Sequence, residues 1–270
     1  MKYFFSHLPE IKNQIARSSG VLLMLDFDGT LSPIAPTPKK AVLPPAVKAE
    51  LKKISSILPA IIISGRSLRD IKNKIKIKGL HYAGNHGSEW QIGGKKTNYF
   101  PEAKPARGIV KKIANKLEPL AQNYPGVLLE NKNLSISIHY RKIDPLLISK
   151  FKKDVEKITK PLIKIYHLRI LKGKKVTELR PYLNWNKGKF ALFVRRLFEK
   201  KLKRKLLPLY VGDDITDEDA FSVLKKDITV RVGQIKNSQG RYYIKSPGQI
   251  KRFMRWLRAN SLFPIPAVKT

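Results

Sequence analysis

The chain has 270 residues and carries 55 lysines and arginines against 20 acidic residues, a formal net charge of +35. It has no cysteine, which excludes disulfides and thiolate metal sites, and no run of about 18 apolar residues, which excludes a predicted transmembrane helix. Residues 1–20 lack a sustained apolar stretch, so we read no signal peptide and expect a cytoplasmic protein.

The positive charge attracts anions, whether nucleic acid or a small anionic substrate. It is spread along the chain, and the densest run, 195–205, also carries the apolar stripe of an amphipathic helix. We therefore interpret that run as the solvated face of a helix and expect neither a nucleic-acid nor a membrane partner. A polyanion-binding protein on a phosphatase-like core is the alternative of a different class.

Apolar runs alternate with helical patterns along the chain. Four runs rich in β-branched residues predict buried strands of a parallel sheet, at residues 21–27, 60–64, 207–213 and 227–232. Amphipathic patterns predict helices at residues 44–58, 68–75 and 186–202. This alternation is typical of a Rossmann-like, doubly wound α/β fold.

The middle of the chain has a different pattern. Residues 134–141 alternate strictly: Leu134, Ile136, Ile138 and Tyr140 face one way, and Ser135, Ser137, His139 and Arg141 face the other. Such alternation predicts a strand with one buried and one solvated face, as in an antiparallel sheet. We therefore expect an inserted α+β domain at 104–180 between core segments 1–103 and 181–270.

Three of the predicted strands end in small polar clusters. The first cluster is Asp26-Phe27-Asp28-Gly29-Thr30, the second is Ser64-Gly65-Arg66, and the third is Gly212-Asp213-Asp214, with Asp217 nearby. The carboxyl ends of parallel strands share one edge, where ligands bind. Two like charges at about 4 Å repel by roughly 4 kcal/mol at an effective dielectric of 20, so these acids require a cation. Oxygen ligands without cysteine indicate Mg²⁺.

A magnesium site beside a guanidinium and a hydroxyl suits a phosphate group. Asp26, at the strand end, could attack phosphorus, and Asp28 could protonate the leaving oxygen and later activate water. For Glu218 and Asp219 we favour a simpler role, because acids at the start of a helix cap it and complement its dipole.

Four motifs in this order resemble those of the haloacid dehalogenase-like phosphatases: "DFDGT", "ISGR", the lysine of "WNKGK", and "GDDITDED". The resemblance implies that Asp26 is the nucleophile and that Asp28 is the general acid and base. It further implies that Ser64 donates a hydrogen bond to the phosphate and that Lys187 offsets the negative charge of the phosphoryl group. It also implies a magnesium site of Asp26, Asp28 through its backbone carbonyl, Asp213, and Asp214 or Asp217, directly or through water.

Longer stretches resemble the trehalose-6-phosphate phosphatase family, among them "AGNHGSEW", "LLENKNLSISIHYR", "VTELRP" and "YVGDDITDEDAF". The resemblance implies that the insert is a specificity cap and that substrate-binding residues come from both parts. Those of the core are Gly65, Arg66, His86, Gly87 and Glu89, and those of the cap are Glu130, Lys132, His139, Arg141 and Glu178. Two departures are Phe27 in place of a tyrosine and Asn133 in place of a frequent glycine; asparagine tolerates left-handed backbone conformations.

We therefore expect a magnesium-dependent phosphatase that acts on a small phosphosugar, trehalose 6-phosphate by resemblance, as a monomer. Closure of the cap would exclude water and bring sugar-binding groups over the phosphate. Another phosphosugar, such as a mannosyl-phosphoglycerate or sucrose phosphate, is the alternative with the same chemistry.

Overall fold

The computed structural model describes residues 1–94, 96–173 and 175–261. The chain divides into a larger unit, made of Met1–Asn98 and the segment from Trp185 onward, and a smaller unit, Tyr99–Asn184. The expected boundaries at 104 and 180 fall a few residues inside the smaller unit, within helix α4 (Ala103–Gln122) and strand β10 (Val176–Pro181). The first boundary between the units falls inside strand β6 (Asn98–Tyr99), and the second falls in the segment between β10 and helix α6 (Lys187–Leu202).

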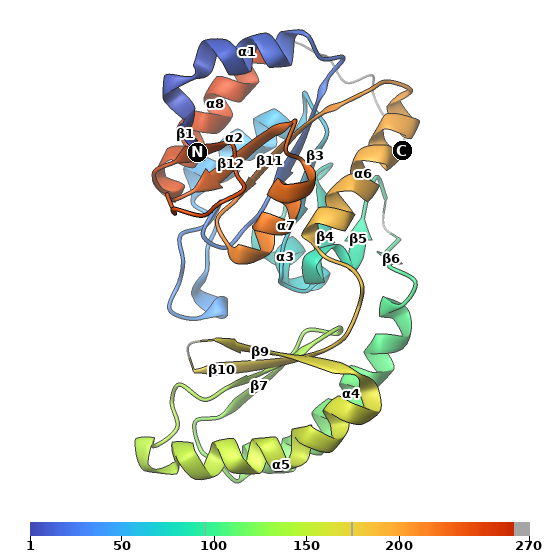
Figure 1. Ribbon diagram of the computed structural model, residues 1–270, viewed down its shortest axis with the longest axis vertical. Coiled ribbons are helices and arrows are strands. Elements are labelled where there is room, and N and C mark those ends of the chain that lie inside the picture. The colour runs from blue at the N-terminus through green and yellow to red at the C-terminus, as the bar shows by residue number, and fades with distance from the viewer. Residues whose placement is uncertain (95, 174, 262–270) are drawn as a thin grey trace. The chain divides into compact units, whose positions relative to one another are not determined.

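The larger unit is built on one mixed sheet (Figure 1). Among the described residues, this sheet has nine strands in the order β1-β13-β12-β11-β2-β3-β4-β5-β6. Their bounds are β1 Lys2–Tyr3, β2 Val21–Leu25, β3 Ala60–Ile63, β4 His81–Gly84, β5 Glu89–Gln91, β6 Asn98–Tyr99, β11 Leu207–Gly212, β12 Ile228–Val232 and β13 Tyr242–Ile244. The seven neighbouring strands β1-β13-β12-β11-β2-β3-β4 pair in parallel, and β5 pairs with β4 in the antiparallel direction. All four predicted strands are present, each one or two residues shorter than its apolar run.

The order of the strands reverses beside β2. From β2 the chain continues to β3 and β4 on one side, whereas β11 and β12 lie on the other. Leu25 of β2 pairs with Val211 of β11, so the two strands end at the same level. Ligands of open α/β sheets bind at such a switch point, outside the carboxyl ends of the strands. The fold therefore places the residues after β2 and β11 next to each other.

Helices cover both faces of this sheet (Figure 1). The helices of the larger unit are α1 Leu8–Ala16, α2 Pro45–Ser55, α3 Leu68–Ile75, α6 Lys187–Leu202, α7 Ile215–Val223 and α8 Ile250–Asn260. Val21, Leu23 and Leu25 of β2 pack in one apolar cluster with α1, α2, α3 and α8. Leu22 and Met24 are buried on the opposite face, which α6 and α7 cover. This two-sided burial explains the continuous apolar runs of the strands.

Two of the three predicted helices begin at a side-chain N-cap. Ser67 accepts a hydrogen bond from the Asp70 N–H at the start of α3, and Asn186 accepts one from the Lys189 N–H at the start of α6. The pattern at 44–58 gives a shorter helix, α2, which begins at Pro45 as expected of a proline in a first turn.

The smaller unit is an antiparallel sheet covered by two helices. Its strands β7 (Leu128–Asn131), β8 (Ile136–His139), β9 (Leu168–Gly173) and β10 follow the order β7-β8-β10-β9. Helices α4 and α5 (Ile148–Tyr166) share an apolar cluster with Ile136, Ile138 and Leu179 of the sheet. The expected α+β architecture is therefore present.

Strand β8 is shorter than its alternating pattern. Asn133 has φ +69°, the left-handed conformation that asparagine tolerates, and the chain turns there before β8 begins. Ile136 and Ile138 face the helices as expected, but Ser135 and Ser137 of the predicted solvated face are also buried. Ser137 Oγ donates to Glu178 Oε2 over 3.1 Å, so a charged neighbour covers this serine.

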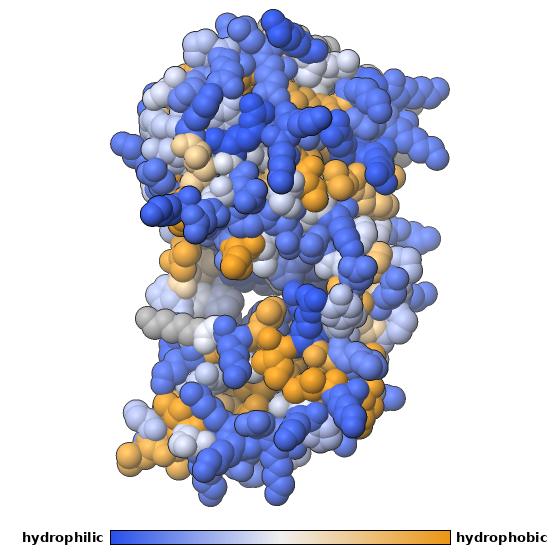
Figure 2. Space-filling view, viewed as in Figure 1, coloured by the Kyte–Doolittle hydropathy of each residue, from blue (hydrophilic) through white to orange (hydrophobic). Residues whose placement is uncertain are grey.

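The surface reflects the composition. On the face drawn in Figure 2, hydrophilic residues predominate, with smaller apolar areas between them. No helix in the described part of the chain combines the length and the apolar composition that a membrane span needs.

Candidate active site

The centre of the site is a buried ion-pair cluster that joins three segments of the larger unit. Asp26 directly follows β2 and is 4% exposed, and its backbone N–H donates to the Val211 carbonyl over 2.9 Å. Lys187, the first residue of α6, donates from Nζ to Asp26 Oδ1 and to Asp217 Oδ1, both at 2.8 Å. Lys187 is 2% exposed. A charge buried this deeply requires a partner, and here one ammonium group joins two carboxylates.

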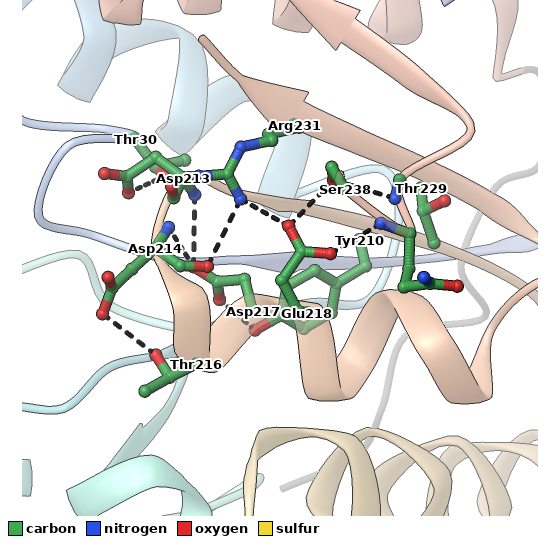
Figure 3. Close-up of polar contacts among 12 residues, drawn as sticks. Thr30, Tyr210, Asp213, Asp214, Thr216, Asp217, Glu218, Thr229, Arg231 and Ser238 are labelled. Carbon is green, nitrogen blue, oxygen red and sulfur yellow. Dashed lines mark hydrogen bonds and ion pairs between the residues drawn. The ribbon is translucent and has the colours of Figure 1, made fainter. Parts of the chain in front are cut away.

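Asp217 is fully buried and is hydrogen-bonded through both carboxylate oxygens (Figure 3). Tyr210 Oη donates to Oδ1 over 2.8 Å, and the backbone N–H groups of Asp213 and Asp214 donate to Oδ2 over 3.1 and 3.0 Å. The contact with Asp214 is one half of a capping box, since the Asp214 side chain accepts from the Asp217 N–H in return. Asp217 therefore stabilises the start of α7 through the capping box and also binds Lys187 in the ion-pair cluster.

Three carboxylates lie close enough together to share a metal ion. Within the described ranges, Asp26, Asp213 and Asp217 each offer one oxygen, and these oxygens lie within 4.8 Å of one another. Burial raises the pKa of Asp213 to about 6, with further contributions from neighbouring carboxylates, and burial also raises the pKa of Asp26. One ammonium does not balance three carboxylates, so this all-oxygen donor set fits a hard divalent cation.

Two glycines allow these carboxylates to approach the backbone. A Cβ at Gly29, where φ is +81°, would stand 1.9 Å from Asp213 Oδ2, and a Cβ at Gly212 would stand 2.2 Å from Asp217 Cγ. Any side chain at either position would displace an acid of the cluster. The glycine of "DFDGT" and that of "VGDD" are thus part of the geometry of the site.

The carboxylates of two expected metal ligands have other partners. Asp214 is exposed and caps α7, and Thr216 Oγ1 donates to it over 3.3 Å. Asp28 receives two hydrogen bonds from Arg66, from Nε to Oδ2 at 2.6 Å and from Nη2 to Oδ1 at 2.7 Å. The contact of an ion with the backbone carbonyl of Asp28, which the resemblance implies, stays a prediction.

The expected phosphate-binding segment lies directly after β3. Ser64 is 1% exposed, its Oγ accepts from the Arg66 N–H over 3.1 Å, and its carbonyl accepts from the His86 N–H over 2.9 Å. A Cβ at Gly65 would lie 2.9 Å from Cε1 of His86, so the imidazole packs against the bare backbone. The structure brings Ser64, Gly65 and His86 together, and their binding roles stay predictions.

The other expected core residues shape the loop after β4. His86 and Gly87 have φ of +59° and +88°, and the Gly87 carbonyl accepts from Trp185 Nε1–H over 2.9 Å. Glu89 is 2% exposed, and its Oε1 accepts from the first N–H of α3, that of Leu68, over 2.8 Å. Glu89 therefore supports α3 and this loop, and a contact between Glu89 and substrate stays a prediction.

The expected cap residues form a polar cluster on the sheet face that α4 and α5 leave uncovered. Glu130, Ser137 and Glu178 pair in register across β7, β8 and β10. Lys132 Nζ donates to Glu178 Oε2 at 2.8 Å, and His139 Nε2 lies 2.9 Å from Glu130 Oε2. We call Glu130, Lys132, His139 and Glu178 the cap cluster. Arg141 lies two residues beyond β8 and is exposed.

The helix-start role expected for Glu218 and Asp219 holds in part: Asp214 and Asp217 form the capping box, and Glu218 lies in the first turn of α7, where an acid complements the helix dipole. Glu218 also accepts from Arg231 Nη1 at 2.6 Å and from Ser238 Oγ at 2.8 Å (Figure 3). Its other oxygen accepts from the Gln239 N–H at 2.7 Å. Glu218 therefore ties α7 to β12 and to the loop at 238–239.

Three residues that support the acids were not predicted from the sequence. Tyr210 holds Asp217, Thr30 Oγ1 donates to Asp213 Oδ1 at 2.9 Å, and Arg231 donates from Nη2 to the Asp213 carbonyl. Arg231 had a detectable signal, since it is a charge inside the apolar run 227–232 and is 7% exposed. Thr30 belongs to the polar cluster after the first predicted strand, but nothing in the sequence indicated its contact with Asp213, and a tyrosine in a buried strand has no signal of its own.

The doubly wound fold is shared with haloacid dehalogenase-like hydrolases. One such hydrolase from Bacteroides thetaiotaomicron superposes with a TM-score of 0.59 at 13% identity, over 88% of this chain and 99% of that one. The profile of the trehalose-phosphatase family matches residues 24–247. The chain belongs to the trehalose-phosphatase family, which confirms the resemblance.

Individual relatives agree with this assignment. The probable trehalose-phosphate phosphatase 2 of Oryza sativa subsp. japonica is 32% identical over 267 residues, covering 90% of this chain and 69% of that protein. The C-terminal domain of the trehalose-6-phosphate phosphatase of C. albicans has the same fold, with a TM-score of 0.74 at 24% identity, over 93% of this chain and 97% of that one.

Proposed function

We propose that this protein hydrolyses trehalose 6-phosphate to trehalose and inorganic phosphate. The observation that carries the proposal is Asp26, a buried carboxylate at the end of the central strand, held by Lys187 beside Asp213 and Asp217. Membership of the trehalose-phosphatase family supports trehalose 6-phosphate as the substrate. A binding module would have no need of a nucleophile in such a cluster.

The proposed reaction has two displacement steps at phosphorus. In the first step, an Asp26 carboxylate oxygen forms a bond to phosphorus while the bond to the sugar oxygen breaks. The electron pair of the broken bond stays on the sugar oxygen, which takes a proton from Asp28. In the second step, Asp28 removes a proton from water as the water oxygen attacks phosphorus, and the Asp26–phosphorus linkage breaks. Lys187 offsets negative charge on the phosphoryl oxygens, and Ser64 donates a hydrogen bond to them.

We propose Asp26, Asp213 and Asp217 as the residues that hold a divalent cation, Mg²⁺ on the chemistry of the donors. When bound, the ion supplies positive charge that offsets the phosphoryl group and the crowded carboxylates. A role for Asp214 or the Asp28 carbonyl at this ion is part of the same proposal. A cytoplasmic location and a monomeric state stay predictions, the second to be checked by analytical ultracentrifugation.

We propose that the cap cluster recognises the sugar. Carboxylates, a lysine and an imidazole on one sheet face offer the donors and acceptors that bind a polyhydroxyl ligand. Arg141 of the same unit belongs to the proposed set of sugar contacts. Another phosphosugar would use the same Asp26 chemistry and differ only in these contacts.

The test of the reaction is phosphate release from a panel of sugar phosphates, with Mg²⁺ and with chelator. We expect trehalose 6-phosphate to be the best substrate, chelator to stop turnover, and Asp26→Asn to abolish turnover while the circular dichroism spectrum is kept. Normal turnover by Asp26→Asn would exclude Asp26 as the nucleophile. If mannosyl-phosphoglycerate or sucrose phosphate is hydrolysed fastest, the proposed reaction at Asp26 stands, but the proposed substrate is wrong.

Glu178→Ala tests the proposed sugar contacts. Loss of a buried hydrogen-bonding group costs about 1–3 kcal/mol, which is roughly one to two decades in rate. We expect that loss in kcat/KM for trehalose 6-phosphate, whereas p-nitrophenyl phosphate, which has no sugar, keeps its rate. Glu156→Ala, an exposed acid on α5 of the same unit, is the matched control and should leave both rates unchanged. Equal losses on both substrates would instead show a structural role for Glu178.

A further inference from the structure

We propose that Arg66 is a positioning residue for Asp28, rather than a ligand of the phosphate as the sequence had indicated. The inference rests on the proposed function, in which Asp28 transfers the proton. It assigns Arg66 the task of holding the Asp28 carboxylate where proton transfer to the leaving oxygen is possible.

The contact between the two residues is bidentate. Nε donates to Asp28 Oδ2 at 2.6 Å and Nη2 donates to Asp28 Oδ1 at 2.7 Å, so the planar guanidinium matches both carboxylate oxygens. A single hydrogen bond leaves a carboxylate free to rotate about its own axis, whereas two parallel bonds fix its plane. The orientation of Asp28 is therefore set by Arg66.

Arg66 is itself held from several segments of the larger unit. Its Nη1 donates to Asp70 Oδ2 at 2.6 Å in the first turn of α3, and its Nη2 also donates to the Pro38 carbonyl at 3.0 Å. The guanidinium carbon lies 5.5 Å from the centre of the Phe27 ring. All three nitrogens of the guanidinium thus have carboxylate or carbonyl partners, which leaves little donor capacity for a phosphate.

The exposure of the two side chains differs in the way that this role requires. The Arg66 side chain is 9% exposed, whereas that of Asp28 is 42% exposed. The buried guanidinium of Arg66 therefore binds the Asp28 carboxylate, and part of the Asp28 side chain stays exposed to solvent. A general acid must come within about 2.6–3.2 Å of the atom that it protonates, so a fixed plane with an open side suits proton transfer.

The test is the dependence of the phosphoryl-transfer step on the leaving group. In single-turnover experiments with excess enzyme, rates are measured for phosphate monoesters from p-nitrophenyl phosphate to trehalose 6-phosphate. The p-nitrophenolate ion leaves without a proton, whereas a sugar alkoxide needs one. We expect Arg66→Met to slow the sugar ester about 10- to 100-fold and to leave the p-nitrophenyl ester within about 2-fold, because positioned acids contribute roughly 10²–10⁴-fold to rate.

Two further variants complete the design. Arg66→Lys keeps the charge but cannot bind both oxygens, so it should recover only part of the lost rate, and it carries the test if Arg66→Met does not fold. Arg69→Met removes an exposed arginine three residues along the same segment and should change neither rate.

Equal losses with every leaving group would overturn the proposal, because they would place Arg66 on the phosphoryl group. Unchanged rates with every leaving group would overturn it as well. Failure of the proposed function gives a different result: wild-type protein would release no phosphate from trehalose 6-phosphate, or Asp26→Asn would remain active, before any Arg66 variant is compared.

Discussion

At the scale of single residues, Lys187 is the side chain on which the cluster depends. Burial opposes its charge, but Asp217 and Asp26 outweigh burial and raise its pKa well above the ordinary value for lysine. The two carboxylates therefore favour the charged form of this ammonium group. Its position could not be read from its own surroundings in the sequence, where it is one of many lysines; only the order of the four motifs singled it out.

Lys187→Met should therefore destabilise the fold. The variant leaves Asp26 and Asp217 buried without their shared partner, and removal of one member of a buried ion pair costs about 3–5 kcal/mol. Urea unfolding measured in the presence of chelator gives the difference directly. Lys200→Met, on the exposed side of the same helix, is the control and should change the free energy of unfolding by less than about 0.5 kcal/mol. A stable Lys187→Met protein would show that the carboxylates find another partner.

At the scale of elements, α7 separates two kinds of acid. Asp217 at its third position belongs to the cluster of three carboxylates and to the capping box, and Glu218 beside it belongs to the contact with β12. Adjacent helical residues point about 100° apart, so one short acidic run serves two different sides of the helix.

The two kinds of acid should separate in a pair of variants. Glu218→Ala leaves Arg231 without its carboxylate and should lower the free energy of unfolding by about 2–3 kcal/mol, with kcat largely kept at saturating Mg²⁺. Asp213→Ala removes one of three crowded carboxylates and should abolish turnover without loss of stability. Glu118→Ala, an exposed acid on α4, is the control for both measurements. Equal loss of activity in both variants, with folding intact, would contradict this division.

The elements themselves were largely predictable from the sequence, and the contacts of their side chains were not. Apolar runs located β2, β3, β11 and β12 because buried strands leave a strong pattern, and the polar residues after them had to share one edge. The burial of Ser137 could not be predicted, because it depends on which strand pairs beside β8 and which side chain that strand presents. The partner of Arg66 was missed for the same reason: a guanidinium suits a phosphate and a carboxylate equally well.

At the scale of the whole molecule, the net charge of +35 acts on every approaching anion. Such a field raises association rates and is screened by salt, with a Debye length of about 10 Å at 0.1 M. In the mechanism that we propose, this field has no direct part in the bond-breaking steps at Asp26, which is buried.

Raising the ionic strength from about 0.05 to about 0.5 M should therefore lower kcat/KM for the anionic substrate and leave kcat unchanged. Steady-state kinetics at fixed Mg²⁺ measures both, and sucrose at equal osmolality is the control for effects other than screening. If kcat/KM does not respond to salt, the charge has no steering role. Strongly salt-dependent binding of nucleic acid, tighter than ordinary non-specific binding, would support the alternative of a polyanion-binding protein.

The insertion of the smaller unit has a consequence for the order of events during synthesis. Strand β2 emerges from the ribosome early, but its neighbour β11 and the lysine that neutralises Asp26, 161 residues away along the chain, emerge only after the whole insert. Until then one edge of the central strand is unpaired and its terminal carboxylate has no counter-charge. The nascent chain carries an open apolar edge for most of its elongation, which is the condition that favours aggregation and recruits chaperones.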